Sequence, residues 1–220
     1  MIPARRGSKG LALKNLRLLG GLPLIAHSIT AALSAATVDH VIVSTEDDEI
    51  AAVAESHGAV VVRRPAALAT DTAQNNAVVR HVIESRPGAD GIVVLLQPTS
   101  PLRQAAQIDA CVRPLLEGRA KSAMTVTAVE HHPGKTVILN DGFVEPFTSD
   151  ADMEARRQTM REVYRQNGAV YAIGVGDFLR EDRFYLRPCQ AVVVPQEDSI
   201  DIDNEIDLAL AEIVLQRRER

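Results

Sequence analysis

The chain has 220 residues, of which 46% are hydrophobic and only 3% aromatic, and its formal net charge is −5. This length fits a single domain with an aliphatic core, and the acidic balance argues against a general nucleic-acid-binding surface. No secretory signal and no apolar run of about 18 residues is visible, so no membrane span is expected. Cys111 and Cys189 form no ligand or redox motif and are expected to be reduced thiols in a cytoplasmic protein.

The opening segment, MIPARRGSKGLALKN, concentrates positive charge around two glycines in this acidic chain. Gly7 and Gly10 let the backbone approach a ligand closely, and Arg5, Lys9 and Lys14 add charge-assisted donors. The loop therefore predicts binding of an anion such as phosphate, although it is neither a P-loop nor a GxGxxG motif. A solvated basic turn is the alternative interpretation.

A first strand should precede such a loop, but only Met1–Ala4 is available for it. A typical strand has about five or six residues. We therefore expect either a very short first strand or residues upstream of Met1 that are missing from this version of the chain.

Beyond the loop, short apolar runs alternate with helical patterns. Strands are predicted at Val41–Ser44, Ala59–Val62, Gly91–Leu96, Ala123–Ala128, Ala169–Ile173 and Ala191–Val194. Helices are predicted at Leu24–Ala36, Asp48–His57, Ala73–Ser85, Ala106–Glu117 and Glu205–Arg217. The alternation predicts an α/β fold with a doubly wound, mostly parallel sheet flanked by helices.

Two segments stand out from this pattern. The last predicted helix carries Ile206, Leu210 and Ile213 on one apolar stripe, as in an amphipathic helix. The stretch 130–166 breaks the alternation, and we interpret it as an insertion within a single 1–220 domain. Insertions of this kind often cover a site or build an interface.

Gln97 follows the strongly apolar run Gly91–Leu96, so it lies at the end of a predicted central strand. A polar amide there is costly unless it is paired or faces a ligand, although it could also cap the next turn. Asp201 and Asp203 are two residues apart and share one face of an extended segment. Such a pair suits a hard divalent ion such as Mg²⁺, while capping of the final helix is the alternative.

Six segments in order along the chain closely resemble the CMP-sialic acid synthetases (CMP-N-acylneuraminate cytidylyltransferases). They are ARRGSKGLALKN, RRPAALATDT, LLQPTSPLR, HHPGKT, RQNGAVY and QEDSIDIDNEIDL. The resemblance runs from Pro3 to the final helix and implies a Rossmann-like nucleotidyltransferase fold. It also implies a Mg²⁺-dependent transfer of CMP from CTP to the anomeric 2-hydroxyl of N-acetylneuraminic acid, with release of pyrophosphate. The implied assembly is a homodimer in which the insertion completes the site of the neighbouring subunit.

The resemblance also implies roles for individual residues. The implied catalytic residues are Arg5, Lys14, Asp201 and Asp203, of which the two aspartates are the implied metal ligands. The implied nucleotide contacts are Arg5, Ser8, Lys9, Lys14, Asn15, Arg64 and Asn75. The implied contacts to the sugar acid are Gln97, Lys135, Arg157, Arg165, Tyr171, Phe184 and Tyr185.

Several alternatives stay open at this point. The same reaction on legionaminic or pseudaminic acid is the close runner-up, and the motifs do not distinguish one metal ion from two. A catalytically inactive nucleotide-binding scaffold is an alternative of another class, which the intact Lys14, Asp201 and Asp203 argue against. Core or interface packing is the alternative role for Phe184 and Tyr185.

Overall fold

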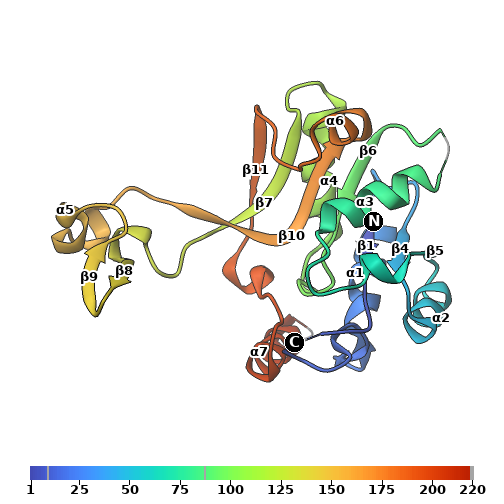
Figure 1. Ribbon diagram of the computed structural model, residues 1–220, viewed down its shortest axis with the longest axis horizontal. Coiled ribbons are helices and arrows are strands. Elements are labelled where there is room, and N and C mark those ends of the chain that lie inside the picture. Colours follow the sequence, from blue (N-terminus) through green and yellow to red (C-terminus); the bar gives the residue numbers. More distant parts are fainter. Residues whose placement is uncertain (9, 87, 219–220) are drawn as a thin grey trace.

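In the computed structural model, helices surround a central sheet, and a long arm projects from one side of this body (Figure 1). The structure describes residues 1–8, 10–86 and 88–218. Lys9, which was predicted to contact the nucleotide, therefore lies outside the described residues.

The predicted strands are all found, with their ends displaced by a few residues. The strands are β1 (Ile2–Pro3), β2 (Leu18–Leu19), β3 (Leu22–Pro23), β4 (Ile42–Thr45), β5 (Val60–Arg63), β6 (Ile92–Leu95), β7 (Ser122–Ala128), β8 (Val137–Asn140), β9 (Phe143–Pro146), β10 (Tyr164–Gly174) and β11 (Cys189–Val193). β1 has only two residues. The β2–β3 and β8–β9 hairpins were not predicted.

The predicted helices are found as well. The helices are α1 (Leu24–Leu33), α2 (Asp48–Ser56), α3 (Asn75–Glu84), α4 (Ala105–Leu116), α5 (Asp150–Glu154), α6 (Val175–Glu181) and α7 (Glu205–Arg218). Local signals explain some ends: Asp47 caps α2 by accepting a hydrogen bond from the Ile50 amide at 2.9 Å, and Gly58 follows the helix with a φ of +88°. The short helices α5 and α6 were not predicted.

Two sets of paired strands form the central sheet. One set has the order β1-β4-β5 and is parallel, and the other has the order β11-β7-β10-β6, in which only β10 runs antiparallel to its neighbours. Met1 joins the two sets, because its carbonyl accepts from the Leu96 amide at 3.0 Å and its amine donates to the Val94 carbonyl at 2.7 Å. The mostly parallel sheet that the sequence predicted is confirmed.

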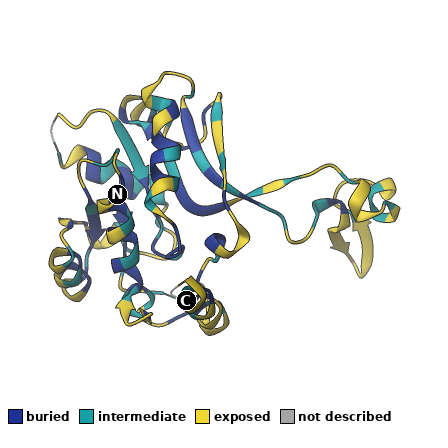
Figure 2. Ribbon diagram, turned by 180° about the vertical axis from the view of Figure 1, so that it is seen from behind, coloured by how far each residue is buried: buried dark blue, intermediate teal, exposed yellow. Residues whose placement is uncertain are grey.

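Helices cover both faces of this sheet, and the core lies between the layers (Figure 2). On one face, Ile29 of α1, Ile50 of α2 and Ile108 of α4 are buried in one cluster with strand residues. On the other face, Val79 of α3 and Phe178 of α6 belong to a second buried cluster. This two-sided cover is what makes the central strands uniformly aliphatic.

The apolar stripe expected on the last helix does not face the core. Ile206, Leu210 and Ile213 of α7 are exposed at 79%, 49% and 49%. The helix instead buries a neighbouring stripe that includes Leu208 and Ala211. This stripe packs on the cluster formed by the loop after β1 and the β2–β3 hairpin, so tertiary packing rather than the widest apolar stripe sets the rotation of the helix.

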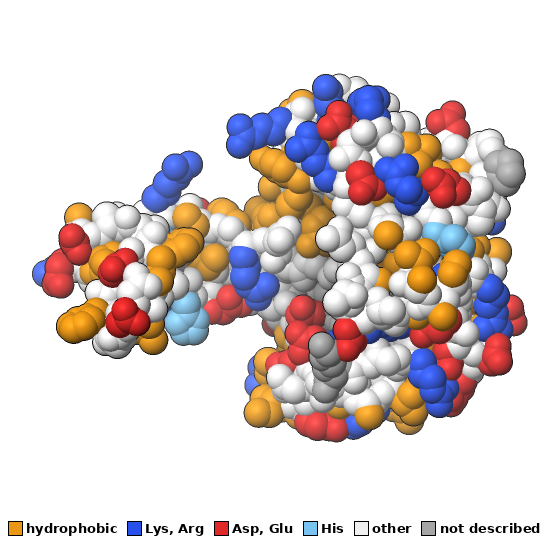
Figure 3. All heavy atoms as spheres, viewed as in Figure 1, with side chains coloured by type: hydrophobic (Ala, Val, Ile, Leu, Met, Phe, Trp, Pro, Cys, Tyr) orange, Lys and Arg blue, Asp and Glu red, His pale blue; other side chains and the backbone are white. Residues whose placement is uncertain are grey.

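The segment between β7 and β10 forms the arm, which carries β8, β9 and α5 (Figure 1). Exposed hydrophobic side chains gather on it (Figure 3), among them Leu139 at 70% and Phe143 at 77%. None of the helices in the described part of the chain is both long and apolar enough to cross a membrane.

Candidate functional site

A polar cleft of about 340 Å³ lies at the carboxyl ends of β1, β5 and β6. In α/β sheets this is the edge where ligands bind. Predicted site residues that line it are Arg5, Ser8, Lys14, Asn15, Arg64, Asn75, Gln97 and Asp201. Residues far apart in the sequence therefore meet here.

The loop after β1 is held in place by its own short-range contacts. The Asn15 side chain donates to the Arg5 carbonyl at 2.8 Å and so closes the loop across its base. Gly10 lies against the segment that carries the predicted metal ligands, because a Cβ at this position would be 2.2 Å from the Asp203 carbonyl oxygen. Glycine is thus required at position 10 for the loop to contact this segment.

Lys14 connects the loop to the same segment. Its Nζ is 2.8 Å from Oδ1 of Asp203, and the lysine side chain is mostly buried whereas the aspartate is 72% exposed. A second ion pair, Arg17–Glu205 at 2.8 Å, makes a similar connection to the first turn of α7. Arg17 and Glu205 are absent from the cleft lining, so of these two ion pairs only the one that Lys14 makes places a charged group in the cleft.

Arg64 is buried at the end of β5 and points into the cleft. Its Nε donates to Oε2 of Glu46 at 3.0 Å, whereas its Nη2 has no hydrogen-bond partner among the described residues. Burial lowers the pKa of this guanidinium, and the charge of Glu46 partly offsets the effect. A buried donor without a partner is costly, so this arrangement favours an acceptor supplied by a ligand.

Glu46 was missed at the level of the sequence. Its Oε1 accepts from the Arg6 amide at 2.8 Å, while Oε2 accepts from Arg64. One carboxylate therefore fixes both the loop after β1 and the buried arginine. The signal was available, because Glu46 directly follows β4 at the same sheet edge as the other site residues.

The segment before α3 closes the side of the cleft. Thr70 and Asp71 line it together with Asn75, the first residue of the helix. Asp71 accepts a hydrogen bond from Arg5 across the cleft. This segment belongs to the motif RRPAALATDT that resembles the synthetases, but the sequence analysis assigned no role to Asp71.

Gln97 lines the cleft after β6 and is packed against a bulge in β10. Gly168 in that bulge has a φ of +77°, and a Cβ on it would lie 2.5 Å from the Gln97 side-chain oxygen. The buried Arg103 donates to the Gln97 carbonyl and, at 2.8 Å, to the Ala169 carbonyl. Burial lowers the pKa of Arg103 to about 9. These contacts fix the position of Gln97.

Arg165 and Tyr171 belong to β10 but are absent from the cleft lining. Arg165 forms an ion pair with Glu130 at 2.9 Å, and its hydrogen bond lowers the pKa of that carboxyl. Burial raises the pKa of Tyr171, and the charge of Asp201 adds to this effect. Tyr171 thus lies within electrostatic range of the cleft.

The remaining predicted sugar contacts lie away from the cleft. Lys135 is on the arm, where its Nζ donates to the Met153 and Ala155 carbonyls at 2.6 and 2.7 Å. Arg157 donates to the Glu130 carbonyl at the base of the arm. The structure therefore does not bring these two residues to the cleft of their own subunit.

Phe184 and Tyr185 also lie outside the cleft. Phe184 is buried against Phe178, with ring centroids 5.0 Å apart, and against Tyr171 at 6.1 Å. Tyr185 is 48% exposed, and its hydroxyl accepts from Arg187. Within this chain Phe184 packs in the core, which was the alternative interpretation of the pair.

Asp201 and Asp203 are the acidic residues expected to bind metal. Asp201 lines the cleft, and Asp203 lies beside it through its contact with Lys14. The described residues contain no group of three or more His, Cys, Asp or Glu side chains arranged to hold a metal ion. The donor set still suits Mg²⁺, which in proteins is commonly held by one or two carboxylates together with water and substrate phosphates.

The chain is similar in sequence and in fold to known proteins. It is 33% identical over its whole length to an N-acylneuraminate cytidylyltransferase of Escherichia coli, of which it spans 52%. It is 34% identical, over 98% of its length, to a CMP-N,N'-diacetyllegionaminic acid synthase of Legionella pneumophila, of which it spans 95%. Among solved structures, a CMP:2-keto-3-deoxy-manno-octonic acid synthetase complexed with CTP shares the fold, with a TM-score of 0.75 at 16% identity over 99% of this chain and 97% of that one.

The chain thus spans about half of the E. coli relative and nearly all of the Legionella relative. A family model described as cytidylyltransferase matches residues 1–206, which include the cleft and every predicted site residue. Together with the sheet topology, this match shows that the chain belongs to the cytidylyltransferase family.

Proposed function

We propose that this protein transfers CMP from CTP to the anomeric 2-hydroxyl of a sialic acid, N-acetylneuraminic acid, and releases pyrophosphate. The observation that carries the proposal is the unpartnered Nη2 of Arg64, which has no hydrogen-bond partner among the described residues and lies in a cleft that also contains Arg5 and Lys14. Three cationic side chains and the backbone of a glycine-containing loop match a nucleoside triphosphate in charge and in donor number.

In the reaction, the 2-hydroxyl oxygen of the sugar attacks the α-phosphorus of CTP and forms a new P–O bond. The bond between the α-phosphorus and the bridging oxygen breaks, and pyrophosphate leaves with that electron pair. The hydroxyl proton passes to Asp201 or to solvent. Negative charge grows on the phosphoryl and leaving oxygens, so the fixed cations Arg5 and Lys14 lower the barrier.

Asp201 and Asp203 would hold Mg²⁺. When bound there, the ion would supply positive charge to the triphosphate and lower the pKa of a hydroxyl that it ligates. Lys14 then has two functions: it contributes charge to the cleft, and it orients Asp203 through their 2.8 Å contact.

Gln97 and Tyr171 are the proposed contacts to the sugar acid from within the same subunit. Gln97 is fixed by Gly168 and Arg103, which suits recognition of a ligand hydroxyl or amide. Legionaminic acid is the second candidate substrate, because the Legionella relative is named for it. Pseudaminic acid is a third. These nine-carbon acids differ in their acyl substituents, and one such contact discriminates by about 1–3 kcal/mol.

The arm is proposed to mediate homodimerisation. Its exposed hydrophobic side chains form a surface that monomers rarely leave uncovered. These side chains include Ile138, Leu139, Phe143, Val144 and Phe147. A second copy of the chain would cover this surface and receive Lys135 and Arg157 at its cleft. Because buried Cys111 lies in the core as a free thiol, a reducing cytoplasmic location is consistent with the proposal.

The test of the reaction is pyrophosphate release from CTP and Mg²⁺, measured in parallel with N-acetylneuraminic, legionaminic, pseudaminic and 3-deoxy-manno-octulosonic acids. Turnover with N-acetylneuraminic acid as the best substrate supports the proposal. Preference for another of these acids would retain the chemistry and correct the substrate. No turnover with any acid, from folded protein that binds CTP, would overturn the proposed activity.

The proposed crossing of the arms has its own test. Lys14→Met inactivates a cleft but keeps its arm intact, and Arg157→Ala impairs an arm but keeps its cleft intact. Each variant alone should have low activity. Co-expression of the two should restore activity if the arm serves the partner's cleft, and should not if Arg157 acts within its own subunit.

A further inference from the structure

Asp201 lies in a segment of irregular backbone ahead of α7, so no strand or helix fixes its position in the cleft. On its carboxyl side, the Ile202 amide donates to the Thr99 carbonyl at 2.8 Å and connects the segment to the loop after β6. On its amino side, the buried Ser199 hydroxyl accepts from Nδ2 of Asn167 in β10 at 2.8 Å. The backbone around Asp201 is therefore held by one contact on each side.

Asn167 is 3% exposed, and both polar atoms of its side chain have partners. Its Oδ1 accepts from the Ala169 amide at 3.2 Å and from the Thr125 hydroxyl at 2.6 Å. Because a backbone amide can only donate, the oxygen must face Ala169, and Nδ2 is left to donate to Ser199. The Ser199 hydroxyl donates in turn to the Pro195 carbonyl at 2.9 Å. The direction of each of these hydrogen bonds is therefore defined.

Thr125 holds the other end of this arrangement. It lies within β7 and is fully buried. Its Oγ1 donates to Asn167 and accepts from the Val170 amide at 3.0 Å, at the bulge where β10 shifts its register against β7. Thr125, Asn167 and Ser199 thus form one buried network, which connects a strand of the central sheet to the segment that carries Asp201.

The same bulge holds Gln97. Gly168 follows Asn167 in the bulge, and the Gln97 side-chain oxygen would lie only 2.5 Å from a Cβ at position 168. The Asn167 carbonyl also accepts from the Ser100 hydroxyl at 3.4 Å, in the loop that Gln97 begins. One bulge therefore contacts the amide that is proposed to bind the sugar acid and, through Ser199, the segment that carries Asp201.

We propose that Asn167 and Ser199 are positioning residues, which hold Asp201 at a fixed distance from Gln97 and so align the sugar hydroxyl with the carboxylate and its metal ion. The roles of Asp201 and Gln97 in this inference rest on the proposed function. Neither Asn167 nor Ser199 lines the cleft, so both act through Asp201 and not on a substrate. Hydrogen bonds are directional, and a buried network in which each member is bonded restrains a segment more closely than apolar packing does.

The first test compares Ser199→Ala with Ser122→Ala in the protein without ligands. Ser122 is equally buried, and its hydroxyl bonds to the Leu186 carbonyl at 2.8 Å and amide at 3.0 Å, at the amino end of β7. Both variants lose a buried hydroxyl, so Tm should fall by similar amounts. Only Ser199→Ala should speed hydrogen exchange at the Ile202 amide. Equal exchange at Ile202 in the two variants would overturn the proposal.

The second test measures binding of Mn²⁺, a paramagnetic substitute for Mg²⁺, by electron paramagnetic resonance in the presence of CTP. Ser199→Ala should weaken Mn²⁺ binding by about tenfold, as loss of a contact behind a metal ligand does, and should lower kcat by a similar factor. The KM for the sugar acid should not change, because Gly168 and Arg103 still hold Gln97. Wild-type Mn²⁺ affinity and kcat in Ser199→Ala would contradict a positioning role.

The third test uses Thr125, which orients the bulge itself. Thr125→Val keeps the shape of the side chain but removes its hydroxyl, so kcat should fall and the KM for the sugar acid should rise together. Thr125→Ser keeps the hydroxyl and should restore both values. Thr127→Val is the control, because Thr127 is buried on the same face of β7 and its hydroxyl has no partner within the described part of the chain. A Thr125→Ser variant as impaired as Thr125→Val would assign Thr125 a packing role and overturn the proposal.

Failure of the proposed function gives a different result. A wild-type protein that releases no pyrophosphate with any of the acids would overturn the reaction. Hydrogen exchange at Ile202 requires no turnover, so it still decides whether the network positions the segment of Asp201.

Discussion

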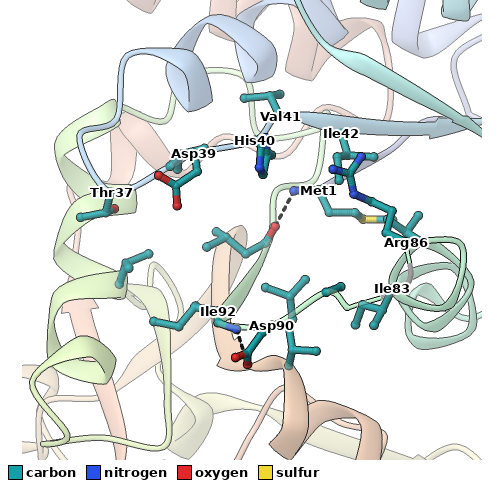
Figure 4. A pocket seen from close by; sticks show the side chains of 18 of the residues that line it. Met1, Thr37, Asp39, His40, Val41, Ile42, Ile83, Arg86, Asp90 and Ile92 are labelled. Atoms are coloured by element: carbon teal, nitrogen blue, oxygen red, sulfur yellow. Dashed lines mark hydrogen bonds between the residues drawn. The ribbon is translucent and has the colours of Figure 1, made fainter.

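The two edges of the central sheet carry hollows of opposite character. The cleft at the carboxyl edge is lined by charged and amide side chains that converge from several loops, and its buried Arg64 has a donor without a partner among the described residues. A second hollow, of about 720 Å³, lies at the amino ends of β4 and β6, and its lining is mostly aliphatic (Figure 4). Among the described residues, the side chains that line this second hollow include no buried polar atom without a hydrogen-bond partner. A buried donor without a partner favours a ligand that supplies an acceptor, so the smaller, polar hollow is the one suited to the reaction.

The largest effect is expected from Lys14→Met, which removes a cation from the cleft. It should lower kcat/KM by about 10²–10³-fold, as loss of a preorganised transition-state donor does. Tm should change little, because a partly exposed ion pair contributes about 0–1 kcal/mol. Arg17→Met is the matched control, since Arg17 pairs with Glu205 at 2.8 Å outside the cleft. Equal losses in the two variants would assign Lys14 a structural role.

A smaller effect is expected from Glu46→Gln, which weakens the contact that positions Arg64. The KM for CTP should rise about tenfold, because a charge-assisted bond to a buried arginine is worth about 1.5–3 kcal/mol. The KM for the sugar acid should not change. Asp48→Asn is the control, because Asp48 pairs with the neighbouring Arg63 at 2.7 Å on the surface. A change in both KM values alike, or no recovery in Glu46→Asp, would contradict a positioning role.

Gly168→Ala should affect the sugar side of the cleft. The new Cβ would displace Gln97, so the KM for the sugar acid should rise several-fold while the KM for CTP stays constant. Gly118→Ala carries the same backbone strain, at a φ of +68°, but meets no atom within 4 Å. Both variants should lose about 1 kcal/mol of stability. If the control shifts the sugar KM equally, Gln97 is not the contact.

The smallest effect concerns the buried amine of Met1, which donates to the Val94 carbonyl at 2.7 Å, and is a pH dependence of stability. The pKa of the Met1 amine is about 5 in the folded chain, against an ordinary value of 8.0, so the unfolded state binds more protons between these two values. The free energy of unfolding should therefore rise with pH from about 5 to 8 and lose this contribution as pH falls. N-terminal acetylation should remove the slope in this window. Identical pH profiles for the free and acetylated chains would show that the amine is not buried.

The sequence predicted the parts of the molecule that depend on local pattern. Residue patterns within short segments were enough to predict the alternation of strands and helices. They also predicted the loop after β1 and the position of Gln97 at the end of β6. Glu46 was missed because its role depends on contacts with Arg6 and Arg64, which are distant in the chain. The prediction of which face of α7 is buried was wrong for a related reason. Tertiary packing buries a neighbouring face of this helix and leaves the apolar stripe exposed.

On the arm, the sequence motifs and the geometry of the single chain disagree about where the site residues lie. Lys135 and Arg157 belong to segments that resemble the synthetases, yet they lie on a projection that leaves their own cleft. The motif therefore predicts membership of a site, and the co-expression of Lys14→Met with Arg157→Ala tests whether that site belongs to a neighbouring subunit.

The most direct measurement is the rate of pyrophosphate release from CTP with N-acetylneuraminic acid and Mg²⁺, for the wild-type chain beside Lys14→Met and Arg17→Met. If the cleft at the carboxyl edge of the sheet is the active site, the Arg17→Met variant should keep the wild-type rate and the Lys14→Met variant should lose most of it. Folded wild-type protein that binds CTP but releases no pyrophosphate with any nine-carbon acid would contradict it.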